Sequence, residues 1–300
     1  MVHAITAAEV AFGSNRFLSA PDCSSPGFSV QDLAALSMIG MAAVLALCEH
    51  AAGPAGGFSP QAIAQRLRQV ACSGGATAQH LIRQLGARRL PVPEIDARFP
   101  FFRALGARAG LTPPPDIYLY RGAMANAFAL GDRAASVILV SEDLLARLDA
   151  REMSAVLAHE IGHILNGDAR LLALAAALEQ MIVDAVTQAM LAEAHMPASG
   201  RVAAARPSPI LLLFVVAPAI ATMLRHGLSR TREYDADRLA AGLMGDPFWL
   251  VETLRKLDTV AYQRAPATSP YPDAVGALMR SHPDANQRIA RLTAPPRTAH

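Results

Sequence analysis

Residues 149–168 have the sequence DAREMSAVLAHEIGHILNGD, and the rest of the chain is organised around this stretch. It contains the pattern HExxH, formed by His159, Glu160 and His163. On a helix, residues four positions apart lie on one face, so both imidazoles can point at one metal ion while Glu160 lies beside them. The pattern therefore predicts two zinc ligands and a general base. A helix with two structural histidines is the alternative, because a catalytic zinc site needs three protein ligands and one open position.

The same stretch carries signals that begin and end a helix. Asp149 is a candidate N-cap, and Glu152 follows three residues later, as in a capping box. Gly167 is a candidate stop signal. An apolar stripe at helical spacing lies between them: Met153, Val156, Leu157, Ile161 and Leu165. We therefore predict one helix between Asp149 and Gly167.

Composition limits the class of protein. The chain has 300 residues, of which 52% are hydrophobic, enough for one large domain or for a domain with an appendage. The net charge is only +2 and there is no long basic run, so we expect no nucleic-acid partner. Cys23, Cys48 and Cys72 are too few and too far apart for a cysteine-type zinc site or a disulfide framework.

The first twenty residues contain Glu9, Asn15 and Arg16 and lack an apolar core of signal-peptide length. The small number of cysteines fits a reducing compartment. We therefore expect the catalytic region in the cytoplasm. Two placements stay open, a membrane-associated protein and a soluble cytoplasmic one.

We predict three parts along the chain. Residues 1–75 form an N-terminal arm with helices, residues 76–294 form the domain that holds HExxH, and residues 295–300 form a tail. Residues 33–48 in the first part are an uncharged apolar run. A helix of that length reaches about 24 Å, against a hydrocarbon core of about 30 Å. A short tilted membrane span and a buried helix are therefore equal alternatives.

Three short runs with strand character precede HExxH, at residues 117–120, 125–130 and 136–140. Turn residues separate them, so they predict a small antiparallel sheet beside the HExxH helix. Helices are expected at residues 60–70, 77–85, 97–109 and 142–148. The predicted fold class is therefore α+β and mainly helical.

Two long segments follow HExxH. In residues 171–196 the polar side chains, among them Glu179 and Asp184, recur at helical spacing opposite an apolar face, which predicts an amphipathic helix. Residues 207–224 are the most hydrophobic run and lie at the lower edge of spanning length. Arginines flank this run at both ends, so it has no charge asymmetry. For residues 210–224 we favour a buried helix or a shallow, non-spanning insertion.

Glu233 is the candidate third ligand. It lies four residues before Asp237 in a predicted helix, so both carboxylates share one face. An exposed face of acid and arginine pairs is the simpler alternative. The metzincin pattern is excluded, because Ala169 stands where that pattern needs its third histidine. With Glu233 as a ligand, Asp237 would orient a ligand histidine by accepting its hydrogen bond.

These features together resemble the gluzincin peptidases typified by the heat-shock protease HtpX and the CAAX prenyl protease. The resemblance covers roughly residues 76–292 and implies a zincin-like peptidase domain. Four elements carry it, in order: residues 126–129 (NAFA) with Gly131, residues 159–168 (HEIGHILNGD), residues 229–237 (SRTREYDAD), and Ser281-His282-Pro283 followed by Arg288-Ile289.

The resemblance implies one zinc ion per chain, bound by His159, His163 and Glu233, with Glu160 as the catalytic base. It also implies that a polypeptide substrate lies extended along an edge strand made of Asn126, Ala127, Phe128 and Ala129. His282 has two interpretations. It could donate a hydrogen bond to the developing oxyanion, or it could be a structural histidine ahead of the last helix.

The sequence therefore predicts a zinc-dependent endopeptidase, and the resemblance implies that it acts on unfolded or membrane-associated proteins. Members of the family carry a hydrophobic hairpin between the HExxH helix and the third-ligand helix, but Glu179 and Asp184 interrupt its first half here. Membrane contact would then involve residues 33–48 and 210–224. A non-catalytic zinc-containing module that binds substrates as a chaperone does is one alternative, and an exopeptidase is another. The oligomeric state stays open.

Overall fold

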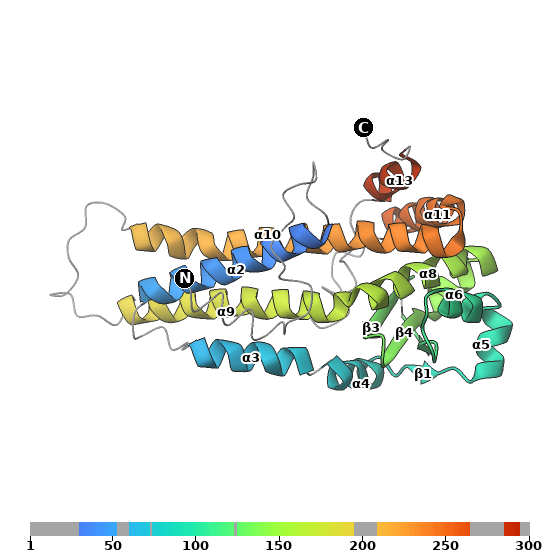
Figure 1. The fold of residues 1–300 in the computed structure, drawn as a ribbon, viewed down its shortest axis with the longest axis horizontal. Helices are drawn as coiled ribbons and strands as arrows, with labels where there is room; N and C mark the ends of the chain where they lie inside the picture. The colour runs from blue at the N-terminus through green and yellow to red at the C-terminus, as the bar shows by residue number, and fades with distance from the viewer. Residues whose placement is uncertain are drawn as a thin grey trace. The chain divides into compact units, whose positions relative to one another are not determined.

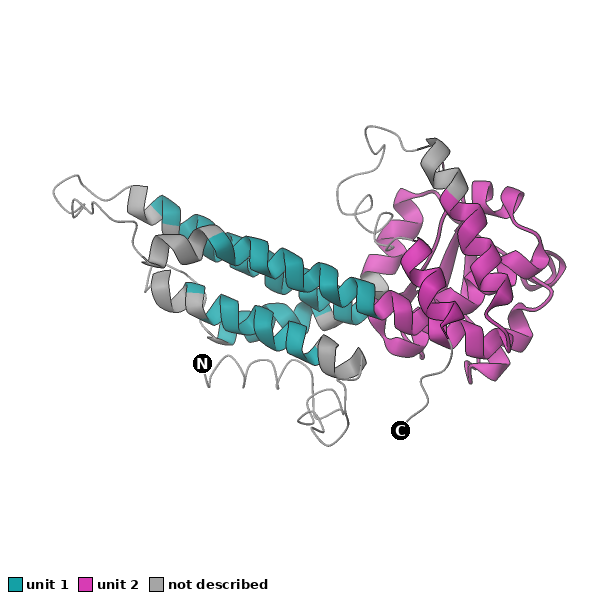
Figure 2. Cartoon of the chain, turned by 90° about the horizontal axis from the view of Figure 1, so that it is seen from above, with its two compact units in different colours: residues 1–73, 170–231 teal, residues 74–169, 232–300 magenta. Residues whose placement is uncertain are grey.

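The computed structural model describes residues 30–52, 60–72, 74–122, 125–194, 209–264 and 285–294. The chain divides into two compact units (Figure 2). The first comprises residues 1–73 and 170–231, and the second comprises residues 74–169 and 232–300. The predicted division differs in one respect, since it places residues 170–231 in the domain at residues 76–294 rather than with the N-terminal part. The three predicted domains, residues 1–75, 76–294 and 295–300, stay a prediction.

The first unit is built from helices (Figure 1). It contains α2 (Val30–Ala52), α3 (Pro60–Cys72), α9 (Asp168–Ala194) from residue 170 onward, and α10 (Pro209–Met244) up to residue 231. The apolar faces of these helices share one core, to which α2 contributes Met41 and Leu45 and α9 contributes Met181 and Ile182. α9 corresponds to the amphipathic helix predicted over residues 171–196, as far as the described residues extend.

The acidic side chains of α9 are paired with groups on neighbouring helices. Glu179 accepts a hydrogen bond from Thr222 of α10 at 2.5 Å and another from Arg225. Asp184 pairs with Arg66 of α3 at 3.3 Å. Pairing matters most for Glu179, because its side chain is mostly buried and an unpartnered buried carboxylate costs free energy.

The two candidate membrane segments both lie in helices of the first unit. Residues 33–48 belong to α2, and residues 210–224 belong to α10. None of the described helices combines the length and the apolar character that a membrane span requires.

The second unit contains a small sheet of β1 (Arg88–Arg89), β2 (Asp116–Tyr120), β3 (Ala127–Gly131) and β4 (Ser136–Ser141). The strands lie in the order β1-β2-β4-β3. β1 is antiparallel to β2 and β3 is antiparallel to β4, but β2 and β4 are parallel. The expectation of a purely antiparallel sheet is therefore wrong for one pair. The physical reason is that β4 pairs with β2 and leaves β3 at the edge, so β2 and β3 are consecutive in sequence but not neighbours.

The helices of the second unit are α4 (Gly74–Gln84), α5 (Val92–Arg98), α6 (Phe102–Arg108), α7 (Glu142–Arg147), α8 (Ala150–Asn166), α11 (Phe248–Arg264) and α13 (Ala285–Thr293), together with the last part of α10. The predicted fold class, α+β and mainly helical with a small sheet, is confirmed. The single helix expected over residues 97–109 is wrong. α5 ends before Pro100 and α6 begins after it, because proline lacks the N–H that a continuous helix requires.

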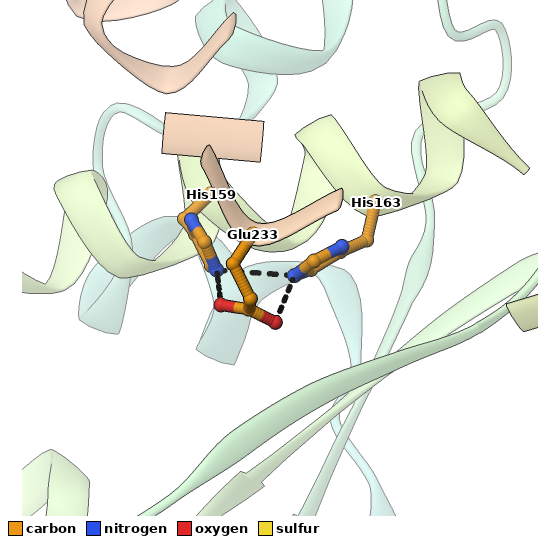
Figure 3. Close-up of side chains that lie close together, drawn as sticks. All are labelled: His159, His163 and Glu233. Atoms are coloured by element: carbon orange, nitrogen blue, oxygen red, sulfur yellow. Dashed lines mark hydrogen bonds and ion pairs between the residues drawn. The ribbon is translucent and has the colours of Figure 1, made fainter. Parts of the chain in front are cut away.

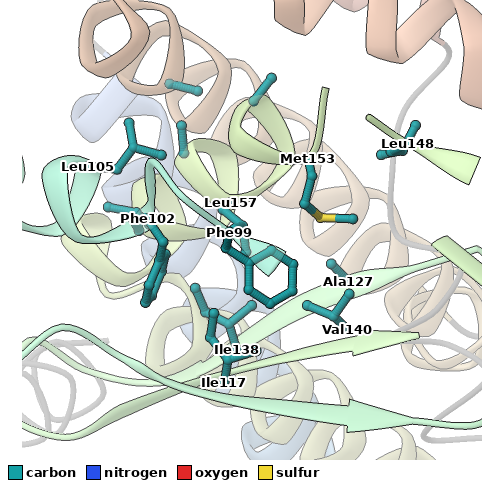
Figure 4. Close-up of a cluster of buried hydrophobic side chains, with 14 of the residues drawn as sticks. Phe99, Phe102, Leu105, Ile117, Ala127, Ile138, Val140, Leu148, Met153 and Leu157 are labelled. Carbon is teal, nitrogen blue, oxygen red and sulfur yellow. The ribbon is translucent and has the colours of Figure 1, made fainter. Parts of the chain in front are cut away.

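The core of the second unit lies between the sheet and α8 (Figure 4). Ile117 and Ile138 project from the strands, and Met153 and Leu157 project from α8. All four side chains are fully buried. Because burying such a side chain stabilises the fold by roughly 1.5–3 kcal/mol, the apolar stripe fixes the rotation of α8 and thereby the direction of its histidines.

The ends of α8 are those that the sequence predicts. One Asp149 oxygen accepts hydrogen bonds from the N–H groups of Arg151 and Glu152, both at 2.8 Å. The Glu152 carboxylate accepts one from the Asp149 N–H at 2.8 Å, which completes the capping box. Gly167 ends the helix in the left-handed conformation with φ 68°. Lys256 of α11 binds the Glu152 carboxylate at 2.7 and 2.9 Å and so joins α11 to α8.

Candidate metal centre

α8 presents His159 and His163 on one face, one turn apart. Their Nε2 atoms are 3.0 Å apart, and their ring planes meet at 86°. The side chain of His159 is 5% exposed, whereas that of His163 is 14% exposed. Both Nε2 atoms therefore face the same point, and His163 is the more accessible of the two residues.

The third donor group comes from α10. Glu233 Oε2 lies 3.4 Å from His159 Nε2, and Glu233 Oε1 lies 3.4 Å from His163 Nε2 (Figure 3). One ligand atom from each of the three residues lies within 4.8 Å of the others. The structure thus brings together the three predicted ligands, which two separate helices supply.

The two helices approach closely at Gly162, the residue before His163. A Cβ atom at Gly162 would lie 3.0 Å from both the Cα and the carbonyl oxygen of Ala236 on α10. That distance is shorter than ordinary van der Waals contact, so a side chain at this position would push the backbone of α8 away from the backbone of α10. Glycine in the HExxH turn therefore allows Glu233 to reach both imidazoles.

The second ring nitrogen of His159 faces a buried carboxylate. His159 Nδ1 lies 3.0 Å from Asp237 Oδ1. Arg288 of α13 donates two hydrogen bonds to Asp237, from Nε at 2.8 Å and from Nη2 at 2.5 Å, and its Nη1 lies 3.5 Å from Glu233 Oε2. Burial raises the pKa of Asp237, but the hydrogen bonds from Arg288 and His159 outweigh it and lower this pKa to about 2. Asp237 thus lies where the sequence predicts an orienting acid.

His163 has an equivalent set of partners. Its Nδ1 lies 2.7 Å from Asp168 Oδ2, and Asp168 Oδ1 accepts a hydrogen bond from Arg232 Nε. Arg232 Nη1 also lies 3.6 Å from Asp235 Oδ2. Asp168 and Arg232 are each only 2% exposed. The Nδ1 atom of each histidine therefore faces one buried aspartate, and each of these aspartates contacts a buried arginine.

The surrounding charges change how readily the histidines bind protons. Burial lowers the pKa of His159, but hydrogen bonds to Asp237 and Glu233 raise it above the ordinary value of 6.5. Burial also lowers the pKa of His163, and the Glu233 charge and the hydrogen bond to Asp168 raise it above 6.5. Without a metal the site therefore favours protons, which compete with a metal ion for the same atoms.

The donor set suits a divalent cation. A neutral ring with its hydrogen on Nδ1 would donate it to the carboxylate there and present a lone pair at Nε2. Two such lone pairs and the Glu233 carboxylate at these distances repel one another unless protons or a metal cation lie among them. Zinc binds to nitrogen and oxygen donors of this kind, with three protein ligands and one open position in its catalytic sites. The residues present therefore fit a zinc ion.

The formal charges around the donors are compatible with a divalent cation. The carboxylates of the cluster outnumber its guanidinium groups by two, an excess that two protonated histidines or one divalent cation would neutralise. The carboxylates belong to Glu160, Asp168, Glu233, Asp235 and Asp237, and the guanidinium groups belong to Arg232, Arg238 and Arg288.

Glu160 follows His159 on α8 and is buried. Its charge contributes to the raised pKa values of His163 and Arg288, which places it in the same electrostatic cluster. A carboxylate beside a metal site can accept a proton from a reacting water molecule. The role of Glu160 as the general base stays a prediction.

Asn126, Ala127, Phe128 and Ala129 lie at and just before the start of β3. β3 is an edge strand, since it pairs with β4 alone among the described strands, and it contacts α8. The Asn126 N–H donates to Ser141 Oγ at 2.9 Å, and the Ser141 N–H donates to the Asn126 carbonyl at 2.9 Å. The substrate-binding role of this strand stays a prediction, and its edge position is compatible with strand addition.

His282 lies outside the described residues, so both of its interpretations stay open. Arg288, Asp168 and Arg232 complete the cluster, but the sequence-predicted site does not include them. All three residues lie within elements of the resemblance: Asp168 in the second, Arg232 in the third and Arg288 in the fourth. The resemblance assigns them no role. Burial of an arginine cannot be read from the sequence, because arginines are mostly exposed unless they are paired.

Comparison with known proteins gives a family match over most of the second unit. The family model described as peptidase family M48 matches residues 101–295. This range includes α8, the third-ligand segment of α10, and α13.

Several curated proteins are similar to this chain. The Protease HtpX homolog of Acaryochloris marina is 38% identical over 200 residues, which cover 63% of this chain and 68% of that protein. The Protease HtpX homolog of Sulfurihydrogenibium sp. is 32% identical over 229 residues, 69% of this chain and 76% of that protein. The Protease HtpX of Legionella pneumophila is 30% identical over 205 residues, 63% of this chain and 73% of that protein.

Among solved structures, the crystal structure of S. mikatae Ste24p is similar, with a TM-score of 0.48 and 20% sequence identity. The match covers 97% of this chain and 64% of that chain. A likeness at this level says nothing about substrate or partners.

Proposed function

Because the chain belongs to peptidase family M48 and is a metallopeptidase, we propose that it is a zinc-dependent endopeptidase with Glu160 as its general base. The observation that carries the proposal is the convergence of His159, His163 and Glu233, whose donor atoms lie within 4.8 Å of one another. Three protein ligands of this kind leave one position for water and substrate.

A zinc ion held by these residues would supply an activated water molecule and would polarise the scissile carbonyl. Glu160 would accept the proton of that water during the attack and deliver it to the departing amine. Asp237 and Asp168 hold the two imidazoles in the tautomer that turns each Nε2 toward the other donors. In this proposal catalysis thus depends on Glu160, which transfers the proton, and on the fixed orientation of the His159 and His163 rings.

We infer a polypeptide substrate that lies extended along β3. The edge of β3 that faces away from β4 pairs with no described strand. A peptide added there would satisfy its backbone groups without recognition of particular side chains, which suits the hydrolysis of unfolded proteins. The contact between β3 and α8 places that edge in the same unit as the three donor groups.

For localisation we propose a cytoplasmic catalytic unit that contacts a membrane peripherally. Large apolar side chains are exposed on both candidate segments: Leu36 and Ile39 on α2, and Val216, Ile220 and Met223 on α10. Exposed apolar groups of this size suit contact with lipid or with another protein. Co-sedimentation with lipid vesicles is the test, and a protein that stays entirely in the supernatant would favour the soluble alternative.

The function is tested with Glu160→Gln. We expect cleavage of casein to fall by at least about 100-fold, while one zinc ion per chain is retained, because Glu160 is not a ligand. Glu142→Gln is the matched control, since Glu142 is an exposed residue of α7 in a surface ion pair with Arg121. It should keep wild-type activity.

The same assay separates the alternatives. Stoichiometric zinc with no cleavage of any substrate would contradict the proposed hydrolysis and favour the non-catalytic binding module or a latent enzyme. Peptides blocked at both termini distinguish the two kinds of peptidase, because an endopeptidase cleaves them and an exopeptidase does not.

A further inference from the structure

Asp168 is the first residue of α9, a position where an acid often does no more than stabilise a helix N-terminus. Its contacts indicate more than that. Oδ2 lies 2.7 Å from His163 Nδ1, and Oδ1 accepts a hydrogen bond from Arg232. Both oxygens of a side chain that is 2% exposed are therefore directed at other side chains of the cluster.

The turn before Asp168 accounts for this direction. Gly167 has φ 68° and ψ 30°, a left-handed conformation that costs little only for glycine. It ends α8 and lets α9 begin with Asp168 pointing back at His163, five residues earlier. The segment from His163 to Asp168 therefore forms a closed local unit in which the carboxylate cannot move far from the ring.

His163 needs such a partner more than His159 does. Its side chain is 14% exposed, against 5% for His159, so packing restricts its ring less. A hydrogen bond from Nδ1–H to a fixed acceptor sets both the tautomer and the rotation of an imidazole. For His163 the acceptor within reach is Asp168.

Arg232 fixes the acceptor in turn. It precedes the ligand Glu233 in α10, and it contacts Asp168 through Nε and Asp235 through Nη1 at 3.6 Å. A buried carboxylate without a cationic partner is strongly destabilising. Arg232 thus compensates the charge of Asp168 and holds it at one place relative to α10.

We propose that Asp168 and Arg232 are a positioning pair that holds His163 in its metal-binding orientation. The inference rests on the zinc site proposed above and adds to it two residues that do not touch metal or substrate. The pair acts on His163 as Asp237 and Arg288 act on His159, but it joins the end of α8 to α10 through the first residue of α9.

The test measures zinc affinity of the full-length protein by competition with a chromophoric chelator, and it records the visible spectrum of the cobalt(II)-substituted protein. Asp168→Ala should bind zinc about 10- to 100-fold more weakly and should show a changed cobalt spectrum. Asp168→Asn keeps an acceptor oxygen for Nδ1–H and should lose less affinity. Arg232→Met should weaken binding as well, and the double variant Asp168→Ala/Arg232→Met should be no weaker than Asp168→Ala alone, because both residues act through one contact.

Lys256→Met is the matched control, because it breaks another ion pair on α8, the one with Glu152, away from the donors. It should lower the unfolding temperature and leave zinc affinity and the cobalt spectrum unchanged. Wild-type affinity and spectrum in Asp168→Asn and Asp168→Ala would overturn the proposal, and so would an equal loss of affinity in Lys256→Met. If Asp168→Ala does not fold, Asp168→Asn and Arg232→Met decide by the same two readouts. A wild-type protein that binds no zinc would instead overturn the proposed function itself.

Discussion

Gly162 sets the distance between the two ligand-bearing helices, since a Cβ atom there would lie 3.0 Å from the backbone of Ala236. We predict that Gly162→Ala separates α8 from α10, weakens zinc binding by at least about tenfold, and lowers the free energy of unfolding by about 1–3 kcal/mol. Chelator competition and urea unfolding measure the two effects.

Gly242→Ala is the control for that substitution. Gly242 also lies in a helix of the second unit, but a Cβ atom there would meet nothing within 4 Å. Alanine should therefore stabilise α10 by roughly 0.5–1 kcal/mol with no change in zinc affinity. If the two alanine variants behaved alike, the close approach would not be what limits the site.

Asp237 should make the metal-free protein sensitive to acid. Its folded-state pKa of about 2 lies below its ordinary value of 3.8, so its ionised form stabilises the fold above the ordinary value, and this stability is lost as the pH falls toward about 2. The contribution is about 2 kcal/mol. We predict that the gap in unfolding free energy between wild type and Asp237→Asn, both treated with EDTA, narrows as the pH falls from about 4 toward 2. A gap that stays constant down to pH 3 would contradict the assigned role of the Arg288 and His159 contacts.

For individual residues, the sequence predicts the three metal donors but not the residues that hold these donors in place. His159, His163 and Glu233 follow from helical spacing and from the resemblance, and the structure brings them together. Asp168 and Arg288 belong to the same cluster, but a contact across helices depends on packing that spacing does not encode. The motifs include Asp168 and Arg288, but the sequence alone does not show what these two side chains contact.

Among the elements, Ser141 links a strand to a helix. Its Oγ accepts hydrogen bonds from the N–H groups of Leu144, at 3.1 Å, and Asn126, at 2.9 Å. We predict that Ser141→Ala lowers the free energy of unfolding by about 1–2 kcal/mol, because it leaves two buried or partly buried donors without this acceptor. Urea unfolding measures the change.

Ser154→Ala is a matched comparison, because Ser154 is also buried but donates to the carbonyl of Ala150 in its own helix. Removing that hydroxyl leaves no N–H group without an acceptor. We therefore expect a smaller loss than for Ser141→Ala. Equal losses would show that the double acceptor at Ser141 contributes little.

The elements themselves are largely predictable, but their pairing is not. α8 begins and ends where Asp149 and Gly167 predict, since capping is a local interaction. The break within residues 97–109 follows from Pro100. The sequence-based prediction gives the helical spacing more weight than this proline and therefore contains one helix. The parallel pairing of β2 with β4 depends on which strand occupies the edge, and no turn residue determines that choice.

Across the whole molecule, the two units should respond differently to loss of metal. All three donors lie in the second unit, and they join α8 to α10. We predict that EDTA abolishes cleavage and increases hydrogen exchange in residues 150–166, 232–244 and 285–293, while exchange in α2 and α3 stays unchanged. Hydrogen exchange followed by mass spectrometry measures this, and readdition of zinc should restore protection. An equal increase in α2 would show that the metal stabilises the chain as one cooperative body.

The contact between Asp168 and Arg232 also closes a long segment of the chain. Asp168 comes just before residues 170–231, which belong to the first unit, and Arg232 comes just after them. A segment whose two ends meet in the host fold can be lengthened, shortened or exchanged without a change in the order of the host elements. Residues 170–231 are therefore tied at both ends by one buried ion pair of the second unit, which keeps the two ends together whatever the length of the segment between them.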